Sequence, residues 1–269
     1  MRERERALTA ATETSRSLGL TVDDVIVLHD SNKVALRLLP CDVMARVAPV
    51  DEQIAQFEID LAQRIDGPVA ALEPRVEPRA YERDGFVVTL WTYYESVPGE
   101  IPAADYADAL VRLHAGMRPV DIVAPHFTDR VAAAERLVAG RDLTPELIDA
   151  DRELLATTLR TMRRVIVERG VAEQLLHGEP HPGNLLNTGS GPLFIDLETA
   201  CRGPVEFDLA HAPDDVSDHY PGLDRDVLRA CRMLKLAMIT TWRWDRGDLF
   251  PDGRRLGVEW LNQIRTGLD

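Results

Sequence analysis

The sequence predicts an α+β fold with two lobes, a small strand-rich lobe followed by a larger, mainly helical one. Short β-branched or apolar runs occupy the first third of the chain, and long helical patterns occupy the rest. Between them, residues 93–99 end in Pro98-Gly99, a dipeptide typical of a turn. We therefore expect an N-terminal lobe over residues 1–95 and a C-terminal lobe over residues 96–269.

The first lobe is expected to hold strands around one helix. The strand patterns cover residues 25–28, 34–39, 43–48 and 86–91. Asp30, Ser31 and Asn32 supply turn chemistry between the first two strands. The helix is predicted over residues 52–66 and ends at Gly67.

The apolar face of that helix carries an unexpected acid. The face is defined by Ile54, Phe57, Leu61 and Ile65. Glu58 lies on or beside this face, and a buried carboxylate is costly unless it is paired. Either Glu58 has a partner, or it sits at the edge of the face with its head group in water.

The second lobe is predicted to be helical. The helices cover residues 103–115, 129–139, 145–169 and 227–244, the last of them mostly buried. For the third, Thr144 is the expected N-cap and Gly170 the stop signal.

The composition limits the classes of function. The net charge of −14 argues against nucleic acid or an anionic membrane surface as a partner. Three cysteines without a CxxC pair indicate neither a disulfide framework nor a thiolate zinc site. The charged N-terminus shows no signal peptide, and no apolar run reaches the ~18 residues of a membrane helix, so we expect a cytoplasmic protein.

A loop at residues 175–186 concentrates polar side chains between apolar ones. Its chemistry-bearing members are His177, Glu179, His181 and Asn184. Two prolines and two glycines exclude regular helix or strand, so the loop must be rigid and must present these groups. Alone, each has a structural reading: the histidines brace the loop, or His181 contacts a substrate, and Asn184 serves a turn.

A hairpin follows the loop and brings Asn184 close to Asp196. With a turn at Gly189-Ser190, paired residue numbers sum to about 379–380, so Asn184 stands opposite Ile195 or Asp196. A few oxygen ligands of this kind suit Mg²⁺, which takes the rest of its shell from water and phosphates. Glu179 could accept a proton from a nearby hydroxyl.

These motifs resemble those of the aminoglycoside phosphotransferase/choline kinase family, which has a protein-kinase-like fold. The catalytic loop His-Gly-Asp-x-His-x-x-Asn corresponds to residues 177–184, and the following Ile-Asp to Ile195-Asp196. The Gly-x-x-x-x-Asp-Leu-Ala pattern corresponds to residues 203–210. The resemblance implies that Asn184 and Asp196 bind Mg²⁺, that position 179 is the catalytic base, and that Asp208 braces the loop.

In the first lobe, the resemblance implies a nucleotide site for ATP or GTP. Arg46 would grip phosphates with Glu58 as its partner. Backbone groups of the connector would read the purine, and the phosphate loop would contribute side chains. The residues concerned are Trp91, Thr92 and Tyr93 in the connector and Ser31 and Asn32, with Lys33 beside them, in the loop.

Three positions depart from the family pattern. Glu179 replaces the usual Asp, and one extra methylene moves a carboxylate by about 1 Å, a misplacement that can cost ~10²-fold in rate. Arg46 replaces a Lys, exchanging a compact ammonium for a planar fork. The phosphate loop at residues 30–33 has no glycine.

The sequence thus predicts a phosphotransferase that moves the terminal phosphoryl of a nucleoside triphosphate to a hydroxyl of a small molecule. An acidic cluster would suit a cationic acceptor such as an aminoglycoside or another amine-bearing antibiotic, unless it is only a solvated loop. Its members are Asp214, Asp215 and Asp218, and Glu198 could hold a second ion or an acceptor amine.

Two other classes stay open. The glycine-free loop and Glu179 would also suit a nucleotide-binding pseudokinase with little catalysis. Alternatively, His177, Glu179 and His181 could ligate the metal of a hydrolase, because alternate residues face one side of an extended segment.

Overall fold

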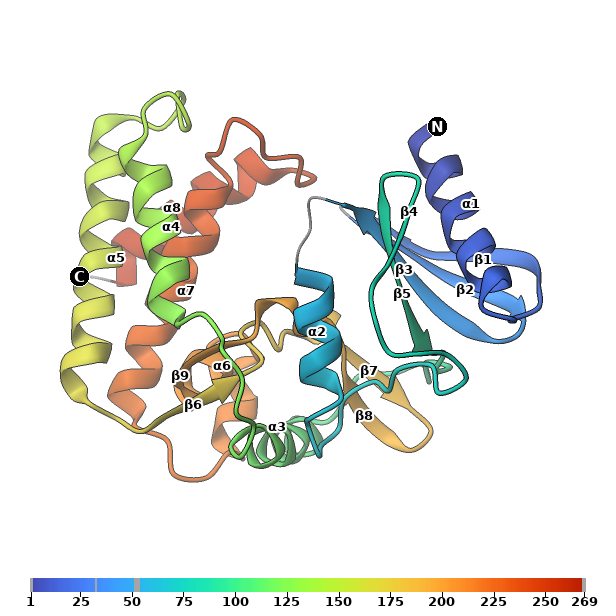
Figure 1. Ribbon diagram of the computed structural model, residues 1–269. Coiled ribbons are helices and arrows are strands. Elements are labelled where there is room, and N and C mark those ends of the chain that lie inside the picture. Colours follow the sequence, from blue (N-terminus) through green and yellow to red (C-terminus); the bar gives the residue numbers. More distant parts are fainter. Residues whose placement is uncertain (1, 32, 51–53, 268–269) are drawn as a thin grey trace.

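The computed structural model, which describes residues 2–31, 33–50 and 54–267, has the α+β architecture expected from the sequence (Figure 1). A five-stranded antiparallel sheet in the order β1-β2-β3-β5-β4 forms the N-terminal part, and helices dominate the rest. The strands are β1 (Val22–Asp30), β2 (Val34–Pro40), β3 (Val43–Pro49), β4 (Tyr81–Arg83) and β5 (Phe86–Thr92).

The sheet sorts its side chains by the two-residue period of a strand. On β3, Val43, Ala45 and Val47 are buried in the N-terminal core. Met44 and Arg46 alternate with them and therefore face the opposite side of the sheet. Arg46 pairs with Ala35 on β2 and with Thr89 on β5, so it lies in the middle of the sheet.

Helix α1 (Arg2–Ser17) packs on the core face of this sheet and was not predicted. Ala7, Ala10 and Ala11 are buried against the strands, while charged residues cover the outer face. Three small side chains make a weak apolar signal, because alanine adds little hydrophobic contrast to a run rich in Arg and Glu.

Helix α2 (Ile54–Ala62) lies between the sheet and the helical part (Figure 1). It ends before the predicted residue 66, and the predicted start at residue 52 lies outside the described residues. Leu61 and Ile65 pack against α3 (Ala103–Met117). Glu58 is also buried, with 2 % exposure.

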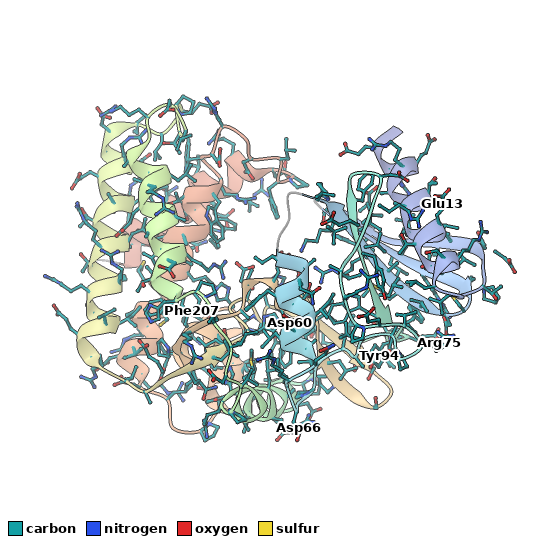
Figure 2. The ribbon with its side chains drawn as sticks, in the orientation of Figure 1. Glu13, Asp60, Asp66, Arg75, Tyr94 and Phe207 are labelled. Atoms are coloured by element: carbon teal, nitrogen blue, oxygen red, sulfur yellow. The ribbon has the colours of Figure 1, made fainter. Side chains whose placement is uncertain are left out.

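The helical part confirms the four predicted helices and adds two more, the short α6 and the C-terminal α8. Around a core that includes Phe207 (Figure 2) lie α4 (Phe127–Ala139), α5 (Asp149–Arg169), α6 (Val205–Leu209), α7 (Arg225–Trp242) and α8 (Gly253–Gly267). The N-cap expected at Thr144 is wrong, because α5 begins only at Asp149. The Thr144 hydroxyl instead donates to the Gly140 carbonyl and closes the turn after α4. Gly170 ends α5 with φ 62°, as predicted.

Two small antiparallel pairs of strands connect the helices and carry the polar loop. The strand β6 (Glu173–Leu176) pairs with β9 (Cys201–Pro204), and β7 (Leu185–Thr188) pairs with β8 (Gly191–Phe194). The loop over residues 177–184 connects β6 to β7. Within the described ranges, no helix has the length and apolarity needed to cross a bilayer.

Candidate active site

A buried carboxylate fixes the polar loop. Asp208, which has no solvent exposure, accepts hydrogen bonds from the backbone amides of His177 (2.9 Å) and Gly178 (2.8 Å). Its Oδ2 also lies 3.0 Å from His114 Nε2. A buried carboxylate with this many donors is well compensated, so the backbone at the start of the loop is held firmly.

His177 braces the loop. Its Nε2 donates to the Ile195 carbonyl over 3.0 Å, and the side chain is completely buried. Burial lowers the pKa of His177, although the nearby Asp208 charge opposes this, and the imidazole is therefore neutral near pH 7. This arrangement matches the reading of His177 as a brace of the loop and not its reading as a metal ligand.

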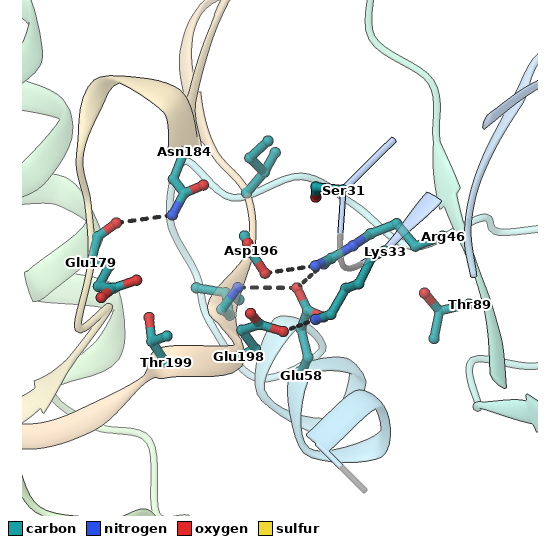
Figure 3. Close-up of polar contacts among 12 residues, drawn as sticks. Ser31, Lys33, Arg46, Glu58, Thr89, Glu179, Asn184, Asp196, Glu198 and Thr199 are labelled. Carbon is teal, nitrogen blue, oxygen red and sulfur yellow. Dashed lines mark hydrogen bonds and ion pairs between the residues drawn. The ribbon is translucent and has the colours of Figure 1, made fainter. Parts of the chain in front are cut away.

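The hairpin brings Asn184 and Asp196 together in the predicted register. Leu185 pairs with Phe194, so partner numbers sum to 379, and the Ile195 amide donates to the Asn184 carbonyl (3.0 Å). The Asn184 side-chain amide donates to the Glu179 carbonyl (3.0 Å), which leaves its oxygen pointing away from Glu179 (Figure 3). Asp196 has φ 66°, a left-handed conformation that is uncommon outside glycine and occurs often at functional sites.

Arg46 joins the sheet to this hairpin. Its guanidinium donates to Glu58 Oε1 (2.5 Å) and to Asp196 Oδ1 (2.6 Å) (Figure 3). The same Glu58 oxygen accepts the Leu197 amide at 3.0 Å. Burial alone would lower the pKa of Arg46, but the charges of Glu58 and Asp196 outweigh it and raise the pKa. Glu58 is therefore buried and paired, the first of its two expected states.

A second ion pair crosses between the same two parts. Lys33, which directly precedes β2, contacts Glu198 in the turn after β8 (Figure 3). The side chains are only 12 % and 19 % exposed. Two cations of the N-terminal part thus meet two acids of the helical part, Arg46 with Asp196 and Lys33 with Glu198.

These groups line a cavity of about 470 Å³. Apolar walls come from Ala35, Met44, Leu186 and Phe194. Most of the predicted nucleotide and metal residues line it as well: Ser31, Arg46, Glu58, Trp91, Thr92, Tyr93, Asn184, Asp196 and Glu198. Asn32 lies outside the described residues. A cavity of this size with apolar walls and a few charged groups is typical of a ligand site.

The connector residues 91–93 already have partners within the protein. The Trp91 ring is buried, with 3 % exposure, and its Nε1 donates to Thr89 Oγ1 (2.8 Å). The Tyr93 ring stacks on the Arg37 guanidinium at 3.9 Å, and the Thr92 amide donates to the Ala71 carbonyl (2.9 Å).

Glu179 and His181 lie beyond this cavity. Glu179 forms an ion pair with Arg130 of α4, a residue that the sequence analysis did not identify. The two are 49 positions apart, so no local signal links them. His181 is exposed, and its Nδ1 accepts the Gly183 amide (3.0 Å).

The acidic cluster carries its own counter-charges. Asp214 lies 3.2 Å from Arg232, and Asp218 lies 3.4 Å from Arg225. Asp215 is exposed on the same short turn. None of the three acids lines the 470 Å³ cavity.

The loop side chains do not assemble a hydrolase metal centre. His177 is buried on Ile195, Glu179 is paired with Arg130, and His181 is turned to Gly183. Across the described residues, no group of three or more His, Cys, Asp or Glu side chains has the arrangement of a metal site.

The site combines a basic residue on the strand-rich part with an Asn and an Asp that line the same cavity. This arrangement is typical of a phosphotransferase of the kinase type. The chain belongs to the phosphotransferase enzyme family, whose model matches residues 28–244. No curated protein matched the chain.

Solved structures share the fold at low sequence identity. Choline kinase LicA from Streptococcus pneumoniae has a TM-score of 0.70 at 15% identity, covering 96% of both chains. APH(2")-IIia, in a GDP and kanamycin complex, has a TM-score of 0.71 at 14% identity, covering 96% of this chain and 98% of that one. Amicoumacin kinase hAmiN, in complex with AMP-PNP, Ca2+ and Ami, has a TM-score of 0.69 at 12% identity, covering 98% and 96%.

Proposed function

We propose that this small-molecule phosphotransferase transfers the terminal phosphoryl group of ATP or GTP to a hydroxyl of its acceptor, with Mg²⁺ as cofactor. The observation that carries the proposal is the convergence of Arg46, Asn184 and Asp196 on one cavity. GDP is named with one structural neighbour, and AMP-PNP and Ca2+ with another, which supports a nucleotide and a divalent cation here.

The purine would lie between the apolar walls, and its phosphates would lie near the cations. Backbone groups of the connector over residues 91–93, other than the Thr92 amide, would read the base edge. Ser31, Lys33 and Arg46 would contact phosphates. The predicted lobes, residues 1–95 and 96–269, would bind the nucleotide between them.

Free cysteines at three positions agree with a reducing cytoplasm.

The metal would be held by Asn184 and Asp196, whose oxygen atoms fit Mg²⁺. The Asn184 amide nitrogen is occupied by the Glu179 carbonyl, so its oxygen is the atom presented to a ligand. When bound, the ion would supply charge neutralisation on the phosphates. Glu198 is a candidate for a second ion or for an amine of the acceptor.

Glu179 would act as the base. Its carboxylate takes the proton of the acceptor hydroxyl as that oxygen bonds to the terminal phosphorus, and the bond from phosphorus to the nucleoside diphosphate breaks. Positioning and charge stabilisation supply most of the catalysis in such a transfer. An amine-bearing acceptor such as an aminoglycoside is the first class to test, with His181, Asp214, Asp215 and Asp218 as candidate contacts.

A nucleotide-binding pseudokinase is the second candidate, because Glu179 is held in an ion pair. The Glu179→Asp variant separates the two candidates. In an enzyme the substitution changes turnover, whereas in a binding protein turnover stays at zero while Mg–nucleotide still binds.

The main test measures ATP and GTP consumption with a panel of hydroxylated amines, sugars and antibiotics. We expect one acceptor class to stimulate consumption, and Asp196→Asn to abolish the stimulation. If no acceptor stimulates consumption and Mg–nucleotide does not bind in calorimetry, the proposal is wrong.

A further inference from the structure

Arg130 contacts both the side chain and the backbone of the polar loop. One nitrogen donates to the Gly178 carbonyl (3.1 Å), and another contacts Glu179 Oε1. The guanidinium carbon lies 5.6 Å from the centroid of the Trp242 ring on α7. Arg130 and Glu179 are 18 % and 22 % exposed, so the contact is largely shielded from water.

The backbone beneath Glu179 has little freedom to shift. Asp208 holds the amides of His177 and Gly178, and the Asn184 side chain holds the Glu179 carbonyl. A cross-linked loop of this kind cannot move back to compensate for a longer side chain. The extra methylene of Glu relative to Asp must therefore be accommodated by the conformation of the side chain itself.

An arginine is suited to that task. Its planar fork can hold a carboxylate and a neighbouring carbonyl at the same time, and such charge-assisted bonds fix direction as well as distance. Trp242 lies against the guanidinium from the other helix, where a cation–π contact adds support. The Glu179 carboxylate is thus tied to α4 and, through Arg130, to α7.

We propose that Arg130 is a positioning residue that sets the place of the Glu179 carboxylate and so allows Glu to serve where the resemblance implies Asp. The inference rests on the proposed function of Glu179 as the base. Arg130 acts through Glu179 and through the loop backbone.

The test is a double-mutant cycle of wild type, Arg130→Ala, Glu179→Asp and the double variant. Consumption of Mg-ATP and Mg-GTP is measured with water as the acceptor and with any acceptor that is active in the panel. We expect Arg130→Ala to lower kcat by about 10–100-fold, while KM for the nucleotide changes less than about threefold. In the Glu179→Asp background, the same change should alter kcat by less than about threefold, because Asp stops short of Arg130.

Two further variants sharpen the cycle. Arg130→Lys should recover only part of the rate, because a compact ammonium lacks the planar fork that spans the Gly178 carbonyl and Glu179 Oε1. Arg163→Ala removes the Arg163–Glu135 ion pair (3.0 Å) between α5 and α4, away from the loop, and should leave kcat unchanged in both backgrounds.

Each contrary result has a distinct meaning. An equal loss of kcat from Arg130→Ala in both backgrounds would show that Arg130 only supports the Gly178 backbone, and no loss would show that it positions nothing. Either result overturns the inference and leaves the proposed function standing. Absence of turnover in the wild type, with Mg–nucleotide still bound, would instead overturn the proposed function and this inference with it.

Discussion

The proposed donor side and the proposed acceptor side of the site are built differently. On the donor side, β3, α2 and the hairpin contribute Arg46, Glu58 and Asp196, which meet directly across long stretches of chain. On the acceptor side, the acids of the 214–218 turn pair with arginines of the helix that follows. The donor side thus depends on contacts between distant parts of the chain, whereas the 214–218 turn is held by ion pairs to the next helix alone.

The largest effect is expected for Asp196→Asn. Removing the charge from the carboxylate that Arg46 contacts should lower kcat/KM for phosphoryl transfer by about 10³-fold, because charge stabilisation is the main contribution to catalysis. Steady-state kinetics with Mg-ATP or Mg-GTP checks this. A loss below about tenfold would mean that substitutions on the donor side lower kcat/KM no more than substitutions on the acceptor side.

Asp208→Asn tests the loop that both sides share. The buried carboxylate of Asp208 satisfies two amides and contacts His114, so its replacement should lower the free energy of unfolding by about 3 kcal/mol. Urea denaturation followed by circular dichroism measures the change. Asp226→Asn, which removes an exposed ion pair with Arg229, is the control and should cost less than about 1 kcal/mol.

Two buried histidines should make stability fall in mild acid. Burial lowers the pKa of His177 and, with the positive charges of Arg130 and Lys235, lowers that of His211 well below its ordinary value. Since the unfolded chain binds these protons more readily, the stabilisation is complete above pH ~6.5 and declines as the pH falls below it.

The measurement is Tm at pH 7.5 and pH 5.5. His211→Gln should show a smaller decrease in Tm than wild type, whereas the exposed His219→Gln should match wild type. Equal decreases in all three proteins would assign the acid sensitivity to other groups.

The smallest effect is expected for Asp214→Asn and Asp218→Asn. Each acid is exposed and already paired with an arginine, so kcat/KM should change less than about threefold with any acceptor. A loss above tenfold that is confined to amine-bearing acceptors would place the acceptor on this turn, and the contrast between the two sides would disappear.

Local signals in the sequence were sufficient for the hairpin. The turn residues Gly189-Ser190 between two apolar runs predicted the register that pairs Leu185 with Phe194, and with it the approach of Asn184 to Asp196. The acid on the face of α2 was also informative, because a buried Glu58 requires a partner.

Other features depend on packing that no local pattern encodes. Arg130 reaches Glu179 because α4 packs beside the loop, and Lys33 reaches Glu198 over 165 positions. The partners of Asp214 and Asp218 come from one face of α7, which is defined only once that helix packs. Helix α1 was missed because its buried face consists of small side chains, three alanines with Thr14 and Ser15, which give little apolar contrast.

The ion pairs Arg46–Asp196 and Lys33–Glu198 affect how a ligand enters the cavity. Each basic group there already has an acidic counterpart, so phosphates and a divalent cation arriving together would exchange partners with these groups, the phosphates pairing with the basic groups and the cation with the acids. Either species alone would leave unmatched charges behind. We therefore expect nucleotide and cation to enhance each other's affinity, and binding of the preformed complex to depend less on ionic strength than binding of the free nucleotide.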